Sequence, residues 1–99
     1  MDHSINNTDF KEKLDSGDYI LIDLRTPEET ATGKINPDAL ERDFYNPNFK
    51  LMINVLKKDK KYLLYCAHAN RSKITLKLMQ DMGFIDVYEL DKGISEYLF

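Results

Sequence analysis

The segment from Tyr62 to Ser72 constrains the fold more than any other part of the sequence. An apolar run at residues 62–65 ends at Cys66, the only cysteine in this chain of 99 residues. Four small or polar residues follow, and Arg71 then opens a segment with helical periodicity. A strand, a tight loop and a helix in this order place a nucleophile at the end of a sheet, where the amide groups of the helix point at it.

The segment after this loop is expected to form a helix that opens at Ser72 and ends at Gly83. Ile74, Leu78 and Met82 recur every four residues, which predicts an apolar face that packs against the sheet. The first turns carry basic side chains and no acidic one, although the N-terminus of a helix favours acidic residues. The helix start is therefore interpreted as part of a site for a negative charge.

Residues 60–80 hold five basic side chains and no acidic one, whereas the rest of the chain holds nine basic and seventeen acidic side chains. This imbalance predicts an electropositive site, in which helix amides and nearby cations favour the reactive thiolate form of Cys66. The alternative reading of the same residues is a buried, inert cysteine next to an ordinary solvated row of lysines.

Strand and helix patterns alternate along the chain, which predicts an α/β fold with a mostly parallel central sheet flanked by helices on both faces. Residues 1–99 are expected to form a single domain, because this length supports one hydrophobic core. The other expected elements are a helix over 8–15 capped by Thr8, strands over 19–24, 39–42 and 87–90, a helix over 49–56, and a last short helix over 93–98.

The segment from Thr26 to Glu29 reads as a capping box with Pro27 at the first helical position, and Gly33 is expected to close this short helix. The box gives Glu29 a local partner, the amide of Thr26. Asp23 ends the preceding apolar run, and we interpret it as a structural carboxylate held by backbone amides.

The run Cys66-Ala67-His68-Ala69-Asn70-Arg71-Ser72 resembles the active-site loop of the rhodanese (sulfurtransferase) family. That family places Cys, four residues, Arg and then Ser or Thr between a strand and a helix. Residues 22–29 resemble the family's Asp-x-Arg-x-x-x-Glu segment, residues 33–39 its Gly-His-Ile region, and residues 83–94 its closing Gly-Phe to Gly-Gly pattern. The resemblance covers about residues 5–97, in the family's order and spacing.

This resemblance implies a sulfurtransferase that moves a sulfane sulfur from thiosulfate, a polysulfide or a persulfide to a thiol or to cyanide. Cys66 would be the catalytic nucleophile and would carry the sulfur as a persulfide. A small anionic donor would bind to the rest of the loop, which consists of Ala67, His68, Ala69, Asn70, Arg71 and Ser72. A protein thiol is the acceptor expected in the cell, and the likeness also suggests a scaffold ion pair between Arg25 and Glu29.

The loop departs from the family pattern at Ala67 and Ala69, where single-domain members usually have Arg and Gly. The first change removes a cation beside the nucleophile, and the second makes a left-handed turn about 1 kcal/mol more costly. Two alternatives therefore stay open. One is a cysteine-dependent phosphatase or arsenate reductase, although those loops have five residues between Cys and Arg. The other is a non-catalytic module that binds a partner.

His68 is the only other titratable group expected beside Cys66, and it could stabilise the thiolate, accept a proton or face solvent. No metal site and no cofactor are expected, because no cluster of Cys, His and Asp has the spacing of metal ligands. The net charge of −3 gives no reason to expect nucleic acid, and no apolar run approaches the ~20 residues of a membrane span. One cysteine and no secretory signal predict a cytoplasmic protein, with monomer and homodimer both open.

Overall fold

The computed structural model describes residues 3–99 and contains a five-stranded sheet in the order β1-β5-β4-β2-β3. Every strand pair in this described part of the chain is parallel. The strands are β1 (Ser4–Ile5), β2 (Tyr19–Asp23), β3 (Leu40–Glu41), β4 (Lys61–Tyr65) and β5 (Asp86–Leu90). In the central pair, Asp23 lies opposite Tyr65, so β2 and β4 end at the same edge of the sheet.

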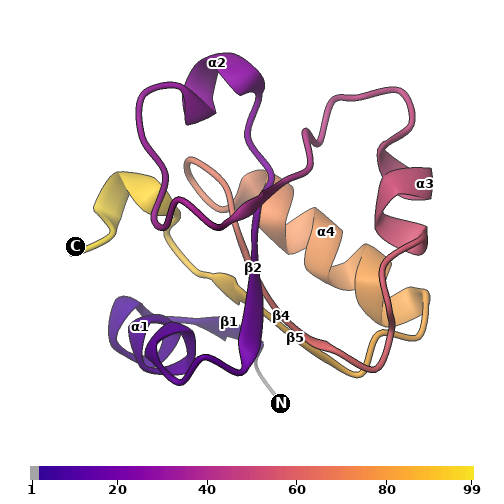
Figure 1. Ribbon diagram of the computed structural model, residues 1–99, viewed down its shortest axis with the longest axis horizontal. Helices are drawn as coiled ribbons and strands as arrows, with labels where there is room; N and C mark the ends of the chain where they lie inside the picture. The colour runs from indigo at the N-terminus through magenta and orange to yellow at the C-terminus, as the bar shows by residue number, and fades with distance from the viewer. Residues whose placement is uncertain (1–2) are drawn as a thin grey trace.

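The helices cover both faces of this sheet, which confirms the predicted α/β fold (Figure 1). They are α1 (Asn7–Asp15), α2 (Pro27–Thr30), α3 (Phe49–Asn54), α4 (Asn70–Asp81) and the single 3₁₀ turn η1 (Ile94–Glu96). In Figure 1, α3 and α4 lie on the opposite side of the sheet from α1 and the yellow C-terminal turn, and α2 lies beyond the end of β2. Among the described helices, none has both the length and the apolar character that crossing a membrane requires.

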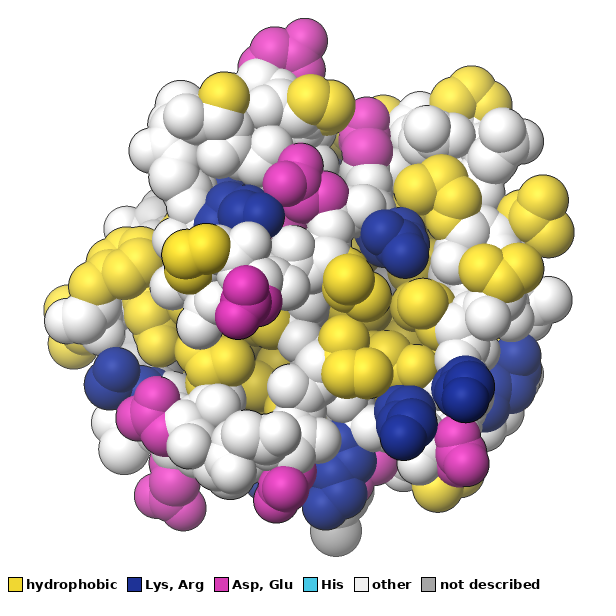
Figure 2. All heavy atoms as spheres, in the orientation of Figure 1, with side chains coloured by type: hydrophobic (Ala, Val, Ile, Leu, Met, Phe, Trp, Pro, Cys, Tyr) yellow, Lys and Arg dark blue, Asp and Glu magenta, His cyan; other side chains and the backbone are white. Residues whose placement is uncertain are grey.

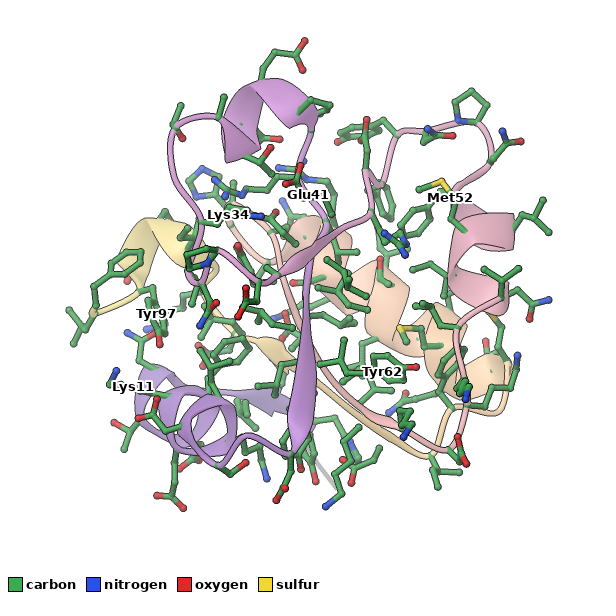
Figure 3. The ribbon with its side chains drawn as sticks, in the orientation of Figure 1. Lys11, Lys34, Glu41, Met52, Tyr62 and Tyr97 are labelled. Atoms are coloured by element: carbon green, nitrogen blue, oxygen red, sulfur yellow. The ribbon has the colours of Figure 1, made fainter. Side chains whose placement is uncertain are left out.

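Strand β4 is covered on both faces of the sheet, and for this reason its sequence is a continuous apolar run. Tyr62, Leu64 and the following Cys66 belong to the core beneath α3 and α4. Leu63 and Tyr65 point the other way, into the core beneath α1 and η1. In Figure 3, Tyr62 accordingly lies on the side of α4, whereas Tyr97 of the second core lies above α1.

The predicted cap of α1 is wrong, because the helix begins one residue earlier than expected. Asn6, not Thr8, is the N-cap, and its side-chain oxygen accepts a hydrogen bond from the amide of Asp9 at 2.8 Å. Three consecutive residues, Asn6 to Thr8, can all cap a helix, so local sequence does not choose among them.

The predicted apolar face of α4 is also partly wrong. Ile74 is 58% exposed, while Ser72, Thr75 and Met79 are the buried residues of the helix. Thr75 can be buried because its hydroxyl donates to the carbonyl of Arg71 at 2.9 Å. Ile74 instead lines a groove of about 700 Å³ between α3 and α4. The last helix is shorter than predicted, since η1 is a single turn.

Candidate active site

Cys66 follows β4 directly and is only 1% exposed, so its sulfur lies inside the loop that leads to α4. The amides of Ala69 and Ser72 donate to Sγ at 3.1 Å and 3.3 Å. The hydroxyl oxygen of Ser72 lies 3.5 Å from Sγ. The expected order of strand, loop and helix is confirmed, and it gives the sulfur two amide donors that favour a negative charge on it.

Ala69 adopts a left-handed backbone conformation with φ of 78°, the only positive φ of a non-glycine residue within residues 3–99. This conformation turns the chain into α4 and aims the Ala69 amide at the sulfur. The sequence comparison with Gly at this position predicted the cost of about 1 kcal/mol that such a turn imposes on alanine. The strain therefore lies directly at the contact with Cys66.

The loop rests on the segment that follows β5. The amides of Ile94 and Ser95 donate to the carbonyls of Cys66 and Ala67 at 2.9 Å and 3.2 Å. Gly93 lies so close to Ala67 that a Cβ on residue 93 would overlap the carbonyl of Ala67. Its φ of 74° also favours glycine. These contacts fix the loop from a segment that is distant in sequence.

Four other amides of the loop remain open for a ligand. Within residues 3–99, no protein acceptor is hydrogen-bonded to the amides of residues 67, 68, 70 and 71. Successive backbone amides in a loop of this kind can bind an anion when no protein acceptor occupies them. Of the loop residues predicted from the sequence, Ala69 and Ser72 contact the sulfur of Cys66, both through their backbone amides and Ser72 also through its hydroxyl.

His68 does not contact the sulfur. Its side chain is exposed, and its Nδ1 lies 3.1 Å from the hydroxyl of Ser95. The sequence left three roles open for His68, and the structure shows its side chain facing solvent.

Arg71 is held by Glu29 through two short contacts, at 2.7 Å and 2.9 Å, and its guanidinium lies over the ring of Tyr45. This guanidinium lowers the pKa of Glu29 to about 2. Glu29 also completes the capping box, because it accepts from the amide of Thr26 at 3.0 Å, as predicted. The suggested ion pair between Arg25 and Glu29 is wrong, because the carboxylate of Glu29 pairs with Arg71 in the loop after Cys66 instead.

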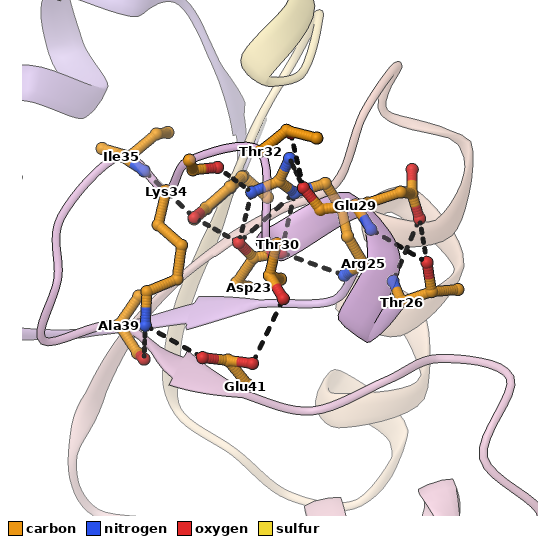
Figure 4. Close-up of polar contacts among 12 residues, drawn as sticks. Asp23, Arg25, Thr26, Glu29, Thr30, Thr32, Lys34, Ile35, Ala39 and Glu41 are labelled. Carbon is orange, nitrogen blue, oxygen red and sulfur yellow. Dashed lines mark hydrogen bonds and ion pairs between the residues drawn. The ribbon is translucent and has the colours of Figure 1, made fainter.

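Arg25 pairs with Asp23, and both side chains are buried (Figure 4). Asp23 accepts from the backbone amide of Arg25 at 3.0 Å, from its guanidinium at 2.8 Å and from the hydroxyl of Tyr65 at 2.5 Å. Burial, and then the hydrogen bond to Asp23, raise the pKa of Tyr65. The guanidinium also donates to the carbonyls of Glu29 and Gly33, so the cluster ties α2 to the sheet. These contacts support a structural role for Asp23, but the predicted partners are only partly right, because one backbone amide and the side chains of Arg25 and Tyr65 hold it.

The predicted electropositive site is wrong, because acidic residues from other elements neutralise the basic ones. The pairs are Arg71 with Glu29, Lys73 with Glu89, and Lys77 with Asp81. Lys60 and Lys61 lie at the start of β4, at the opposite end of the strand from Cys66. A count of charges along the sequence cannot detect such neutralisation, since two of the three acids are distant in sequence.

Glu89 is a site residue that the sequence analysis missed. It is fully buried in β5 and accepts from the hydroxyl of Ser72 at 2.5 Å and from the ammonium of Lys73 at 3.0 Å. The hydroxyl of Ser4 also donates to it. The available signal was a glutamate at a position of β5 that alternation with the buried Val87 assigns to the core. Within residues 3–99, no group of three His, Cys, Asp or Glu side chains is placed to hold a metal ion.

Comparison with known families gives a match to the rhodanese-like domain over residues 6–98. Among curated proteins, the chain is 33% identical over 99 residues to the tRNA uridine(34) hydroxylase of Wigglesworthia glossinidia brevipalpis, covering 97% of this chain and 31% of that protein. It is 34% identical over 89 residues to the tRNA sulfurtransferase of Shewanella halifaxensis, covering 88% of this chain and 18% of that protein. The chain thus spans about a third or less of the length of these relatives.

Among solved structures, the rhodanese-related protein of Thermoplasma volcanium superposes with a TM-score of 0.82 at 27% identity, over 96% of this chain and 89% of that one. A rhodanese-like domain protein of Staphylococcus aureus gives a TM-score of 0.81 at 29% identity, over 99% and 92% of the two chains. Both are similar to the present chain in fold and in extent.

Proposed function

Since the chain belongs to the rhodanese-like domain family, we propose that it is a sulfurtransferase in which Cys66 carries the transferred sulfur. The Cys66 thiolate attacks the outer sulfur of thiosulfate, a polysulfide or a donor persulfide. A new S–S bond forms at Sγ and the S–S bond of the donor breaks. Sulfite leaves from thiosulfate, a shorter polysulfide from a polysulfide and a thiolate from a persulfide, each with the bonding electrons. The protein is left with a persulfide on Cys66.

An acceptor completes the cycle at the same sulfur. A thiolate of a protein or small molecule, or cyanide in an assay, attacks the outer sulfur of the persulfide. The bond between the outer sulfur and Sγ breaks, and the Cys66 thiolate returns. Because both half-reactions use one site, donor and acceptor bind in turn and ping-pong kinetics follow.

The observation that carries this proposal is the set of backbone amides in the loop after Cys66. Two amides, from Ala69 and Ser72, donate to Sγ, and the amides of residues 67, 68, 70 and 71 have no protein acceptor in the described part of the chain. Backbone donors fixed before the reaction stabilise negative charge without reorganisation. They suit both the outer sulfur of a persulfide and the anionic end of a donor.

The position of Arg71 argues against a phosphatase or arsenate reductase. Its guanidinium donates to both carboxylate oxygens of Glu29 and is therefore occupied in bracing the loop. The four residues between Cys66 and Arg71 also make a smaller ring than the five of those enzymes. A small ring favours a single sulfur atom over a tetrahedral oxyanion.

Two of the relatives are named for activities on tRNA, so binding of nucleic acid by this chain has to be considered. On the face seen in Figure 2, basic and acidic side chains are interspersed, and the net charge of the chain is −3. Binding of nucleic acid relies on clustered positive charge. We therefore expect this chain to deliver sulfur to a thiol acceptor, and not to hold tRNA by itself.

Intact-mass measurement after incubation with thiosulfate or polysulfide tests the proposal. The wild-type protein is expected to gain about 32 Da, the mass of one sulfur atom, and to lose it on addition of cyanide or a reducing thiol. Cys66→Ser, which keeps the size of the side chain, should gain nothing while remaining folded. A wild-type protein that gains no sulfur from any of these donors would favour the non-catalytic module.

A further inference from the structure

The buried carboxylate of Glu89 is linked to the sulfur of Cys66 through one hydroxyl group, that of Ser72. Ser72 Oγ lies 2.5 Å from Glu89 Oε1 and 3.5 Å from Cys66 Sγ. Glu89 is fully buried and lies on the face of β5 that belongs to the core, where an apolar residue would avoid the cost of burying a charge. A residue that breaks the local pattern in contact with a site is a candidate for function.

The hydroxyl of Ser72 has a single hydrogen, which it can donate to one acceptor. Three acceptors surround it: Glu89 Oε1 at 2.5 Å, the carbonyl of Ala69 at 3.1 Å and Cys66 Sγ at 3.5 Å. The carboxylate is both the nearest and the charged acceptor, so it takes the hydrogen. Ser72 Oγ then presents only lone pairs to the sulfur, which suits a thiol S–H and opposes a thiolate.

We propose that Glu89 is a positioning residue that keeps the hydrogen of Ser72 away from Cys66 and thereby lowers the share of the reactive thiolate. The loop thus contains two opposed influences on one sulfur. The amides of Ala69 and Ser72 favour the thiolate, while Glu89, acting through the Ser72 hydroxyl, opposes it. This inference rests on the proposed function only in that the thiolate is the form that attacks a sulfur donor.

Donors from two other elements hold the carboxylate of Glu89 in place. Lys73 of α4 donates to Oε2 at 3.0 Å, and the hydroxyl of Ser4 in β1 donates to the same oxygen. The charged partner of this carboxylate is Lys73, and the titratable sulfur of Cys66 lies across Ser72. The nearby imidazole of His3 is turned to the carbonyl of Val87.

The rate of alkylation of Cys66 by iodoacetamide, measured against pH, tests this inference without any sulfur donor. Glu89→Gln keeps the size of the side chain, and its carbonyl can still accept from Lys73 while its amide donates to Ser72 Oγ. Two acceptors then remain for the Ser72 hydrogen, the carbonyl of Ala69 and the sulfur of Cys66, and the sulfur as a thiolate is the charged one. The hydrogen can therefore turn to the thiolate and stabilise it. We expect alkylation about tenfold faster than in the wild type at pH 7, and a pH–rate profile displaced to lower pH.

Ser72→Ala gives a second test that does not depend on how the protein tolerates a change at Glu89. Loss of the opposing lone pairs should speed alkylation a few-fold, and in this background Glu89→Gln should have a smaller effect than alone. Thr75→Val is the matched control, because Thr75 is a buried hydroxyl of α4 that bonds to Arg71 and not to the sulfur. It should leave the rate unchanged.

The outcomes separate the inference from the proposed function. Slower alkylation in Ser72→Ala, or an unchanged rate in a folded Glu89→Gln protein, would overturn the inference, since Ser72 would then donate to the sulfur or Glu89 would not act on it. A wild-type protein that forms no persulfide would overturn the proposed function. The effect of Glu89 on alkylation would still be measurable in that case.

Discussion

Two buried carboxylates, Asp23 and Glu89, lie near the ends of parallel strands, and their partners differ. The partner of Asp23, Arg25, is only 5% exposed, and the cluster is closed off from solvent. The partner of Glu89, Lys73, is 51% exposed, and Glu89 also reaches the sulfur through Ser72. Asp23, whose partners are all buried, is therefore part of the scaffold. Glu89 contacts the half-exposed Lys73 on one side and Ser72, next to the sulfur of Cys66, on the other, so it can influence the reactivity of Cys66.

The same isosteric change at the two carboxylates should reduce stability by clearly different amounts. Asp23→Asn leaves the charge of Arg25 buried without a counterion, so we expect it to reduce the free energy of unfolding by about 3 kcal/mol or more. Glu89→Gln leaves Lys73 half in solvent and should cost clearly less. Urea denaturation measures both, and equal losses of stability would remove the distinction between a closed and an open cluster.

Arg71→Lys tests a third carboxylate, Glu29, which is partly exposed and holds the loop after Cys66 through Arg71. Lysine keeps the positive charge but cannot donate to both oxygens of Glu29 as the guanidinium does. Persulfide formation on Cys66 should therefore slow at least tenfold, with the fold retained, in single-turnover measurements. Equal rates in the two proteins would mean that Arg71 supplies only charge.

The ion pair between Arg71 and Glu29 should also make the free energy of unfolding depend on pH, and this effect should be smaller than those above. Arg71 lowers the pKa of Glu29 from 4.5 to about 2, so the stabilisation by the charged carboxylate is complete above about pH 4.5 and is lost as the pH falls towards 2. The stability difference between the wild type and Glu29→Gln should be constant between pH 5 and 7 and should shrink between about pH 4.5 and 2. A difference that stays constant down to pH 2 would contradict the ion pair.

Local signals in the sequence were sufficient for much of the fold. The apolar runs of β2 and β4 have the pattern of strands buried on both faces, and the capping box of α2 is encoded within four residues. The loop at Cys66 was predicted for the same reason, since strand, loop and helix follow one another directly. The strain at Ala69 could also be predicted, from the comparison with glycine at its position.

The remaining features depend on contacts between residues far apart in the sequence. Arg71 meets Glu29 across 42 positions, and Lys73 meets Glu89 across 16. These pairs decide the electrostatics of the site, and they turn a run of basic residues into a set of neutral ion pairs. Neither composition nor periodicity contains this information, because both treat each segment by itself.

The central claim, that Cys66 passes on a sulfur atom, is tested most directly by discharging the loaded protein. The wild-type protein is treated with thiosulfate or polysulfide, separated from the donor and then mixed with cyanide. The account predicts about one thiocyanate per chain, with the mass returning to that of the untreated protein and with no thiocyanate from Cys66→Ser. A protein that gains the sulfur but releases none to cyanide or to a thiol would contradict it.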